Sequence, residues 1–276
     1  LMNHEKALEK VIYEFNDDPP DLLGNNQISG ERKYVNNIKY TYKRTLRDIE
    51  KILPNTDKVI CELGSFLGIV SKTLAYQGYK VNACDIPSFF DRQEVKEYYK
   101  KAGINVFGFN LRDYKLPFED SSQDLVIACE VFEHLNFNPL PVIDEINRVL
   151  KLNGYLYVAM PNSSSFIKRI RFLFTGKHPT FSISELFAQL DPNDNMIVGL
   201  HWREFSKDDA LKMIAPLGFN LESFRISSEA GANNGNFLKR FIKFLIYKIP
   251  GFGNTQVFVF RKTKRNELVF SINKDS

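Results

Sequence analysis

The sequence predicts an α/β protein with a doubly wound, parallel sheet of about seven strands. From residue 57 onward, short apolar runs alternate with stretches that have helical spacing. These runs are apolar on both faces, as in parallel strands that helices cover on both sides. The expected strands are 58–63, 79–85, 104–110, 123–130, 154–160, 219–226 and 255–262.

Helices are expected before and between these strands. An amphipathic pattern over 2–16 ends at Asp18-Pro19-Pro20, a loop follows to about residue 30, and a second pattern over 31–53 ends at Pro54. Proline ends a helix because its ring clashes with the preceding turn. The later helices are expected after Gly68 and over 91–102, 141–150 and 206–217.

The spacing of these elements divides the chain into four parts. We expect an N-terminal helical extension over 1–56 and a cofactor-binding core over 57–162. The stretch over 163–205 is too long for a routine connection and indicates an insertion or substrate cap. Residues 206–276 complete the sheet and hold a second, basic and aromatic insertion over 227–254.

Composition excludes several classes of protein. With 276 residues, 43% of them hydrophobic and 25% charged, the chain is neither collagen-like, disordered nor a disulfide scaffold. A net charge of +4 is too small to indicate nucleic acid. The three cysteines lie in apolar runs, which favours reduced, buried thiols and no metal site. With neither a signal peptide nor a membrane span in the pattern, we expect a cytoplasmic protein.

The turn after the first strand indicates a nucleoside-containing cofactor. It reads Glu62-Leu63-Gly64-Ser65-Phe66-Leu67-Gly68, and Asp85 ends the next strand. Glycines at such a turn let the backbone approach a ligand, and an acid at the second strand can accept both ribose hydroxyls. Glycines also occur at such turns for local geometry alone, so this segment by itself leaves both interpretations open.

An ordered series of motifs extends this pattern. In this respect the chain resembles the class I, Rossmann-like S-adenosylmethionine-dependent methyltransferases, whose first motif is an acid followed by Gly-x-Gly-x-Gly. Glu62, Gly64 and Gly68 match that motif, and Phe66 stands at the middle glycine. The later matching segments are Asp85, Asn110-Leu111-Arg112-Asp113, Leu116-Pro117-Phe118, Asp124-Leu125-Val126-Ile127, Glu130-Val131-Phe132-Glu133-His134-Leu135, Leu150-Lys151, Asn153-Gly154 and Met160-Pro161-Asn162.

The resemblance implies a mostly parallel, seven-stranded sheet whose last strand is antiparallel, and it implies S-adenosylmethionine as the cofactor. It also assigns roles to these residues. Asp85 would bind the ribose, Asp113 the adenine amino group, and Glu130 would face the methionine end or the acceptor. Glu62 would orient the glycine turn or meet the methionine amine. The full set of expected cofactor-binding residues is Glu62, Gly64, Ser65, Phe66, Gly68, Asp85, Ile86, Leu111, Arg112, Asp113 and Glu130. A nicotinamide enzyme is disfavoured because the turn lacks the Gly-x-Gly-x-x-Gly that cradles a pyrophosphate.

Methyl transfer from a sulfonium needs little catalytic machinery beyond alignment, and a hydroxyl acceptor adds the need for a base. His134 and His201 are the candidate bases, although His134 also fits a structural or cofactor-shell role and His201 a packing role at a helix entry. The segment Ala128-Cys129-Glu130-Val131 lacks the motifs of base-modifying enzymes, so a small molecule, sugar or lipid-like acceptor is favoured over nucleic acid.

Two basic, aromatic stretches, 166–174 and 237–248, are expected above the carboxyl edge of the sheet. They fit a helix packed on the domain or a homodimer contact, a cap on an anionic acceptor, or peripheral attachment to an anionic membrane. The resemblance extends to methyltransferases of bacterial surface-glycan synthesis, which implies O-methylation of a sugar or phosphate-bearing glycan precursor. The alternative is a non-catalytic S-adenosylmethionine-binding module acting through a protein or membrane partner. Tyrosines in the N-terminal helices, among them Tyr34, could line the cofactor site.

Overall fold

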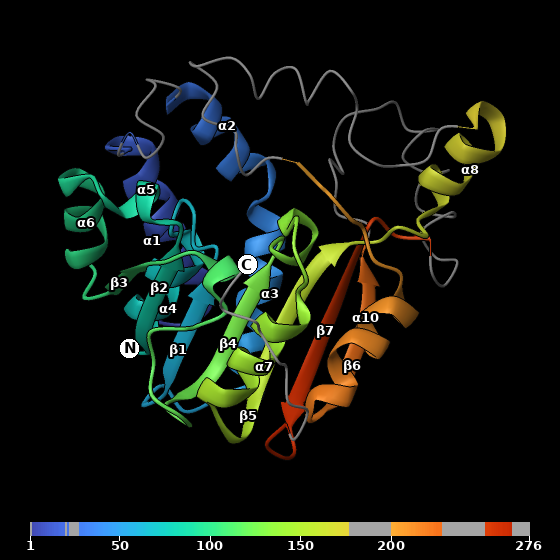
Figure 1. The fold of residues 1–276 in the computed structure, drawn as a ribbon. Coiled ribbons are helices and arrows are strands. Elements are labelled where there is room, and N and C mark those ends of the chain that lie inside the picture. The colour runs from blue at the N-terminus through green and yellow to red at the C-terminus, as the bar shows by residue number, and fades with distance from the viewer. Residues whose placement is uncertain (1, 20, 22–27, 177–199, 228–251, 267–276) are drawn as a thin grey trace.

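The computed structural model describes residues 2–19, 21, 28–176, 200–227 and 252–266. They form a seven-stranded sheet of order β3-β2-β1-β4-β5-β7-β6 between two layers of helices (Figure 1). The strands are β1 (Val59–Leu63), β2 (Lys80–Asp85), β3 (Asn105–Gly108), β4 (Gln123–Cys129), β5 (Leu150–Pro161), β6 (Phe219–Ser227) and β7 (Thr255–Lys262). The predicted fold class, with its antiparallel last strand, is confirmed.

The pairing of the strands defines one functional edge. Strands β1 to β5 pair in parallel, so they all end at the same edge of the sheet, which is uppermost in Figure 1. Strand β7 is antiparallel to both β5 and β6, and Thr255 pairs with both Pro161 and Ser227 at that edge. The turns that follow β1, β2 and β4 therefore emerge side by side, which is where α/β sheets bind ligands.

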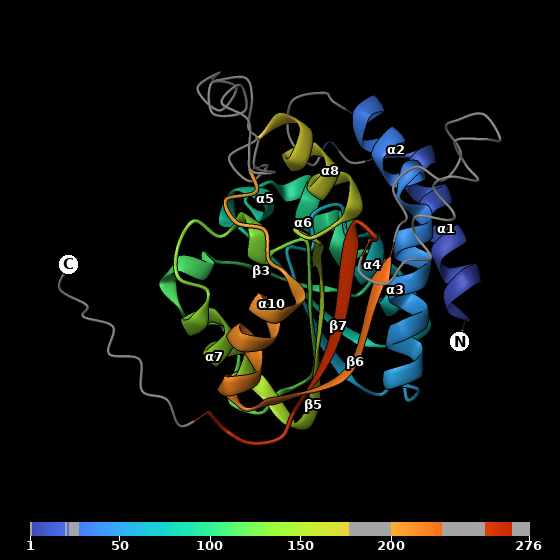
Figure 2. The same ribbon diagram turned by 90° about the vertical axis from the view of Figure 1, so that its right-hand side faces the viewer.

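Helices cover both faces of the sheet (Figure 2). α1, α3 and α4 lie on one face, and α7 and α10 lie on the other. The helical segments are α1 (His4–Asp17), α2 (Ile28–Asn37), α3 (Lys39–Ile52), α4 (Ile69–Gln77), α5 (Pro87–Phe90), α6 (Gln93–Lys100), α7 (Leu140–Val149), α8 (Phe166–Thr175) and α10 (Lys207–Ile214), with 3-10 turns η1 (Leu111–Asp113), η2 (Phe132–His134) and η3 (Ala215–Leu217). None of the helices in the described ranges is long and apolar enough to cross a lipid bilayer.

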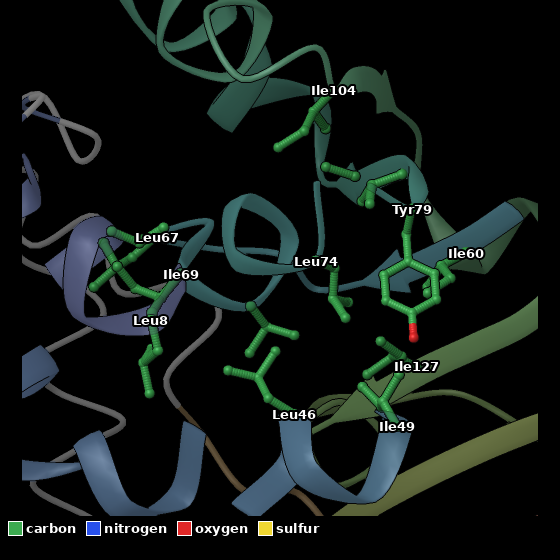
Figure 3. Close-up of a cluster of buried hydrophobic side chains, with 14 of the residues drawn as sticks. Leu8, Leu46, Ile49, Ile60, Leu67, Ile69, Leu74, Tyr79, Ile104 and Ile127 are labelled. Atoms are coloured by element: carbon green, nitrogen blue, oxygen red, sulfur yellow. The ribbon is translucent and has the colours of Figure 1, made fainter. Parts of the chain in front are cut away.

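The N-terminal helices share a hydrophobic core with the sheet. Leu8 of α1 and Leu46 and Ile49 of α3 are buried in one cluster with Ile60 of β1 and Leu74 of α4 (Figure 3). Apolar residues recur at three- and four-residue intervals in both helices, so each turns one apolar stripe to the core. The N-terminal extension thus closes one face of the sheet.

Several boundaries differ from those expected. The helix expected over 31–53 is two helices, α2 and α3, which meet at Ile38, and α2 begins inside the expected loop. The break follows Asn36 and Asn37, residues whose side chains compete for backbone hydrogen bonds, and the Asn36 amide donates to the Arg32 carbonyl. Strand β5 begins at Leu150 rather than 154, because this segment pairs with Gln123 before the chain bends at Asn153.

Candidate active site

The turn between β1 and α4 is a left-handed backbone segment. Its φ angles are 68° at Gly64, 44° at Phe66 and 68° at Gly68. A Cβ at Gly64 would lie 3.0 Å from a methyl carbon of Val131, and one at Gly68 would lie 2.8 Å from the Tyr99 ring. Both glycines are therefore required by close packing as well as by backbone conformation.

Asp85 ties this turn to the end of β2. Its carboxylate accepts hydrogen bonds from the Phe66 backbone N–H (2.9 Å) and the Ile86 backbone N–H (2.8 Å). Burial raises the pKa of Asp85, and these two hydrogen bonds oppose that effect. Each carboxylate oxygen keeps a second lone pair, so Asp85 can still accept hydrogen bonds from a ribose.

Two other predicted residues lie beneath the turn. The Glu62 carboxylate is buried and accepts a hydrogen bond from the Ser71 hydroxyl. Burial raises the pKa of Glu62 to about 8, with the Ser71 hydrogen bond opposing the rise and the Asp85 charge adding to it. Ser65 is also buried, and its hydroxyl lies 3.3 Å from the Tyr99 hydroxyl. These contacts support an orienting role for Glu62 and direct the Ser65 side chain into the protein.

An aromatic cluster flanks the turn. The Phe66 ring meets Tyr34 of α2 and Phe89 of α5 edge to face, with centroid distances of 6.2 Å and 5.8 Å. Burial raises the pKa of Tyr34, and the Glu130 charge adds to the rise. Tyr34 is therefore near both Phe66 and the tip of β4. The sequence pointed to Tyr34 without placing it and missed Phe89, whose only signal was its position just after Asp85.

The residues expected around the adenine follow β3 at the same edge of the sheet. Asn110 caps η1 by accepting a hydrogen bond from the Arg112 backbone N–H at 3.0 Å, and Asp113 is exposed. The Arg112 guanidinium carbon lies 5.3 Å from the centroid of the Phe137 ring, whereas Leu111 is half-buried. The Asp113 carboxylate is thus open to a ligand, while the Arg112 side chain is directed toward the loop after η2.

The end of β4 carries two acids with different environments. Glu130 adopts a φ of 53°, its N–H donates to the Ala159 carbonyl at 2.7 Å, and its side chain is exposed at the edge. Glu133, in η2, is 0% exposed. Desolvation by the surrounding protein raises the pKa of Glu130, and burial together with the charge of Glu130 raises that of Glu133 well above its ordinary value.

The two candidate histidines lie together, with ring centroids 4.8 Å apart. Nδ1 of His134 lies 3.0 Å from the Leu200 carbonyl oxygen, and Nδ1 of His201 lies 3.4 Å from Oε1 of Glu204. Burial lowers the pKa of His134, as does the nearby His201. With Nδ1–H donating to these oxygens, Nε2 is the basic atom of each ring.

Tertiary contacts hold His201 in this position. The Trp202 N–H donates to the Glu133 carbonyl at 2.8 Å, and the Gln256 amide donates to the Phe205 carbonyl at 2.7 Å. Glu204 also accepts a hydrogen bond from Lys168 of α8, so it bridges α8 and His201. Sequence reasoning missed Glu133, Glu204 and Lys168 as site residues. The only signal for the two acids was their position beside the candidate histidines.

Asp124, part of the matching motif at β4, lies at the opposite edge of the sheet. Its carboxylate receives hydrogen bonds from Lys58, Lys151 and the Val59 N–H. This residue joins the amino ends of three neighbouring strands and therefore has a structural role.

The first basic, aromatic stretch forms α8 above the carboxyl edge (Figure 1). Its apolar residues Phe172, Leu173 and Phe174 are exposed, and so are Arg169 and Arg171. The second stretch, 237–248, lies outside the described residues.

Comparisons with known proteins identify the domain and the fold that this chain resembles. Residues 61–158 match the family model of a methyltransferase domain. Over an alignment of 94 residues, which covers 31% of the chain, the sequence is 33% identical to an uncharacterized protein of Methanocaldococcus jannaschii. The matched segment spans 41% of that relative.

Solved structures share the fold over most of the chain. A S-adenosylmethionine-dependent methyltransferase from Methanosarcina mazei has a TM-score of 0.55 at 19% identity and covers 78% of this chain and 96% of its own. A Haloferax volcanii methyltransferase, solved in complex with the Trm112 methyltransferase activator, has a TM-score of 0.59 at 15% identity, with 84% and 95% covered. A Thermotoga maritima S-adenosylmethionine-dependent methyltransferase has a TM-score of 0.54 at 17% identity, with 92% and 100% covered. Residues 61–158 therefore match a methyltransferase domain, and the chain has the class I S-adenosylmethionine-dependent methyltransferase fold, which implies S-adenosylmethionine as the cofactor.

Proposed function

We propose that this protein is a S-adenosylmethionine-dependent O-methyltransferase that acts on a sugar or a phosphate-bearing glycan precursor. The observation that carries the proposal is the arrangement of the carboxyl edge. There the Asp85-anchored glycine turn lies on one side of β4, and Glu130, His134 and His201 lie together at its tip.

The cofactor fits the residues on the β1–β2 side. Gly64 and Gly68 allow the left-handed backbone of the turn beside Asp85, and Asp85 retains lone pairs for the ribose hydroxyls. Asp113 is exposed after β3 at the same edge of the sheet, and we assign it to the adenine amino group. S-adenosylmethionine supplies an activated methyl group on a sulfonium.

We propose that the acceptor binds at the carboxyl end of β4, beside His134 and His201. As the new O–CH3 bond forms, the S–CH3 bond breaks and its electron pair stays on sulfur, while Nε2 of His134 or His201 takes the hydroxyl proton. A positioned base of this kind contributes about 10² to 10⁴-fold to rate. Because Nδ1 of His134 is held by a backbone carbonyl, that ring is fixed in orientation.

The nature of the acceptor is inferred from α8. This helix lies above the carboxyl edge of the sheet and exposes Arg169 and Arg171 beside aromatic rings. Guanidinium groups pair with phosphate oxygens, and aromatic rings pack on sugar or lipid carbon surfaces. The combination of guanidinium groups and aromatic rings supports a phosphate-bearing glycan precursor as the acceptor. The acceptor could also carry a lipid that lies in an anionic membrane.

The experiment begins with calorimetry of the full chain against S-adenosylmethionine and S-adenosylhomocysteine. We expect one binding site per chain for each. Incubation with labelled donor and fractionated glycan-precursor pools should then place label on an acid-stable methyl ether. Binding without turnover in any pool would favour the non-catalytic module, and no binding of either compound would refute both functions.

Single alanine substitutions of His134 and His201 test the base. We expect at least one of them to lower kcat by 10² or more, on the scale of general-base catalysis, while the affinity for S-adenosylhomocysteine stays within about twofold. His4→Ala is the matched control, because His4 pairs with Glu50 in the N-terminal helices. Full activity in both site variants would remove the histidine assignment.

A further inference from the structure

Glu133 is the site residue that the proposed function leaves unexplained. It is 0% exposed, and neither carboxylate oxygen has a hydrogen-bond partner within the described part of the chain. A buried carboxylate without a donor or a cation is strongly destabilising. Its charge must therefore be neutralised, by a proton or by a positive ion.

The described neighbours of Glu133 do not supply that positive charge. Lys168 is paired with Glu204, and Glu130 adds a second negative group. The guanidinium carbon of Arg203 lies 5.3 Å from the centroid of the Phe205 ring, and Arg203 is exposed. The buried Glu133 carboxylate therefore lies near a second acid and beside two imidazole rings.

Glu133, His134 and His201 each offer one ligand atom, and the three atoms all lie within 4.8 Å of one another. Each histidine ring is also held in orientation through its other nitrogen. Nδ1 of His134 contacts the Leu200 carbonyl, and Nδ1 of His201 contacts the Glu204 carboxylate. Metal-binding histidines are characteristically held this way, with the second ring nitrogen donating to a carbonyl or a carboxylate.

We propose that Glu133, His134 and His201 bind a divalent first-row transition-metal ion. Two imidazoles and one carboxylate suit such ions, Zn²⁺ among them, and suit Mg²⁺ or Ca²⁺ less well, because these prefer oxygen ligands. Bonds of about 2.0–2.2 Å place neighbouring ligand atoms about 3–4 Å apart, so small side-chain adjustments close the site. This proposal departs from the sequence-based expectation of no metal site.

The consequence for the reaction rests on the proposed function. An imidazole nitrogen bound to a cation cannot also take the acceptor's proton. With the ion bound, the acceptor hydroxyl would coordinate it, become more acidic and release its proton to solvent water before the methyl group moves from sulfur to oxygen. The histidines would then activate the acceptor through the ion.

Metal binding is tested directly on the full chain after chelator treatment and dialysis. Calorimetric titration with Zn²⁺ should give one ion per chain, and Co²⁺ should give visible absorption bands characteristic of nitrogen and oxygen ligands. Absence of both signals at micromolar protein would overturn the proposal, because Glu133 would then be neutralised by a proton instead.

Variants locate the ion. We expect Glu133→Gln, His134→Ala and His201→Ala each to weaken Zn²⁺ binding at least tenfold and to change or abolish the Co²⁺ bands. Glu204→Gln should weaken binding by about 10–100-fold, as for a group that orients a ligand. His4→Ala should bind as the unmodified protein does. Unchanged Zn²⁺ affinity in both His134→Ala and His201→Ala, or an equal loss in His4→Ala, would place the ion elsewhere and refute the site.

The two proposals fail separately. Circular dichroism and S-adenosylhomocysteine binding report whether each variant is folded, and neither depends on turnover. Zn²⁺ binding at this site without any S-adenosylmethionine binding would sustain the metal site and refute the proposed function. Methyl transfer that survives complete chelation, with no Zn²⁺ bound, would sustain the proposed function and refute the metal site.

Discussion

Phe66 holds a backbone conformation, φ 44°, that is unfavourable for a residue with a Cβ. It stands where a glycine would meet that requirement without strain. The structure compensates by packing its ring against Tyr34 and Phe89 and by anchoring its N–H on Asp85. Thus a residue that departs from the glycine pattern keeps the left-handed turn and adds an aromatic contact to the N-terminal helices.

Glu62 makes stability depend on pH. Its pKa is about 8 in the folded protein against an ordinary value of 4.5, so between these values the folded chain holds a proton that the unfolded chain has lost. The stabilising effect of that proton is complete below about pH 4.5 and disappears as the pH rises through 8. Relative to Glu62→Gln, the unmodified protein should lose up to about 1.4 kcal/mol of stability per pH unit across this window.

The measurement is the free energy of unfolding in urea for both proteins at several pH values from 5 to 8. Glutamine keeps an oxygen that can accept from Ser71. A difference between the two proteins that stays constant with pH would contradict the burial of an ionisable group at this position.

At the scale of elements, the β1–α4 turn depends on a close contact with α6. Gly68→Ala introduces a Cβ 2.8 Å from the Tyr99 ring at a φ of 68°, so we expect both a conformational and a steric cost. Together these should destabilise the protein by about 2–5 kcal/mol.

Gly103→Ala is the matched control for this substitution. Gly103 has a φ of 72°, but a Cβ there would meet nothing within 4 Å. Its cost should therefore be the conformational part alone, about 1–2 kcal/mol. Urea denaturation of the two variants gives the difference, and equal costs would show that Tyr99 yields freely to the new methyl group.

At the scale of the whole molecule, polar contacts join the N-terminal helices to the far strands of the sheet. Asp48 of α3 pairs with Arg225 of β6 and accepts a hydrogen bond from the Tyr157 hydroxyl of β5 at 3.0 Å. Because these contacts and the hydrophobic cluster of Figure 3 cross the same interface, we expect α1 and α3 to unfold together with the sheet in one transition.

Asp48→Ala tests this connection. Breaking a buried ion pair costs about 3–5 kcal/mol, and the partial exposure of Arg225 reduces the expectation to about 2–3 kcal/mol. Lys43→Ala on the same helix removes an exposed pair with Glu5, which solvent screens, and should leave the free energy of unfolding nearly unchanged. Equal unfolding free energies for the two variants, or a separate early transition in the unmodified protein, would contradict a shared core.

The candidate site shows how far local patterns reach. The turn from Glu62 to Gly68 and the acid at Asp85 were recognisable because a strand, a glycine turn and a second strand occur at short sequence separation. The buried contact that makes Gly68 necessary was not recognisable, because Tyr99 reaches the turn from α6. The helix break at Ile38 and the early start of β5 were missed for a related reason, since local propensities there were weak and packing set the boundary.

The amino-acid sequence by itself determined the order of strands and helices, the class of fold and the turn that implies a S-adenosylmethionine site. Those features follow from hydrophobic periodicity and from residue types at short spacing. Only the tertiary structure decided that Glu133 is buried without a partner, that His134 faces His201, and that Glu204 joins His201 to α8. The physical reason is that a side chain's charge, partner and exposure depend on groups brought together from distant parts of the chain, which no local pattern records.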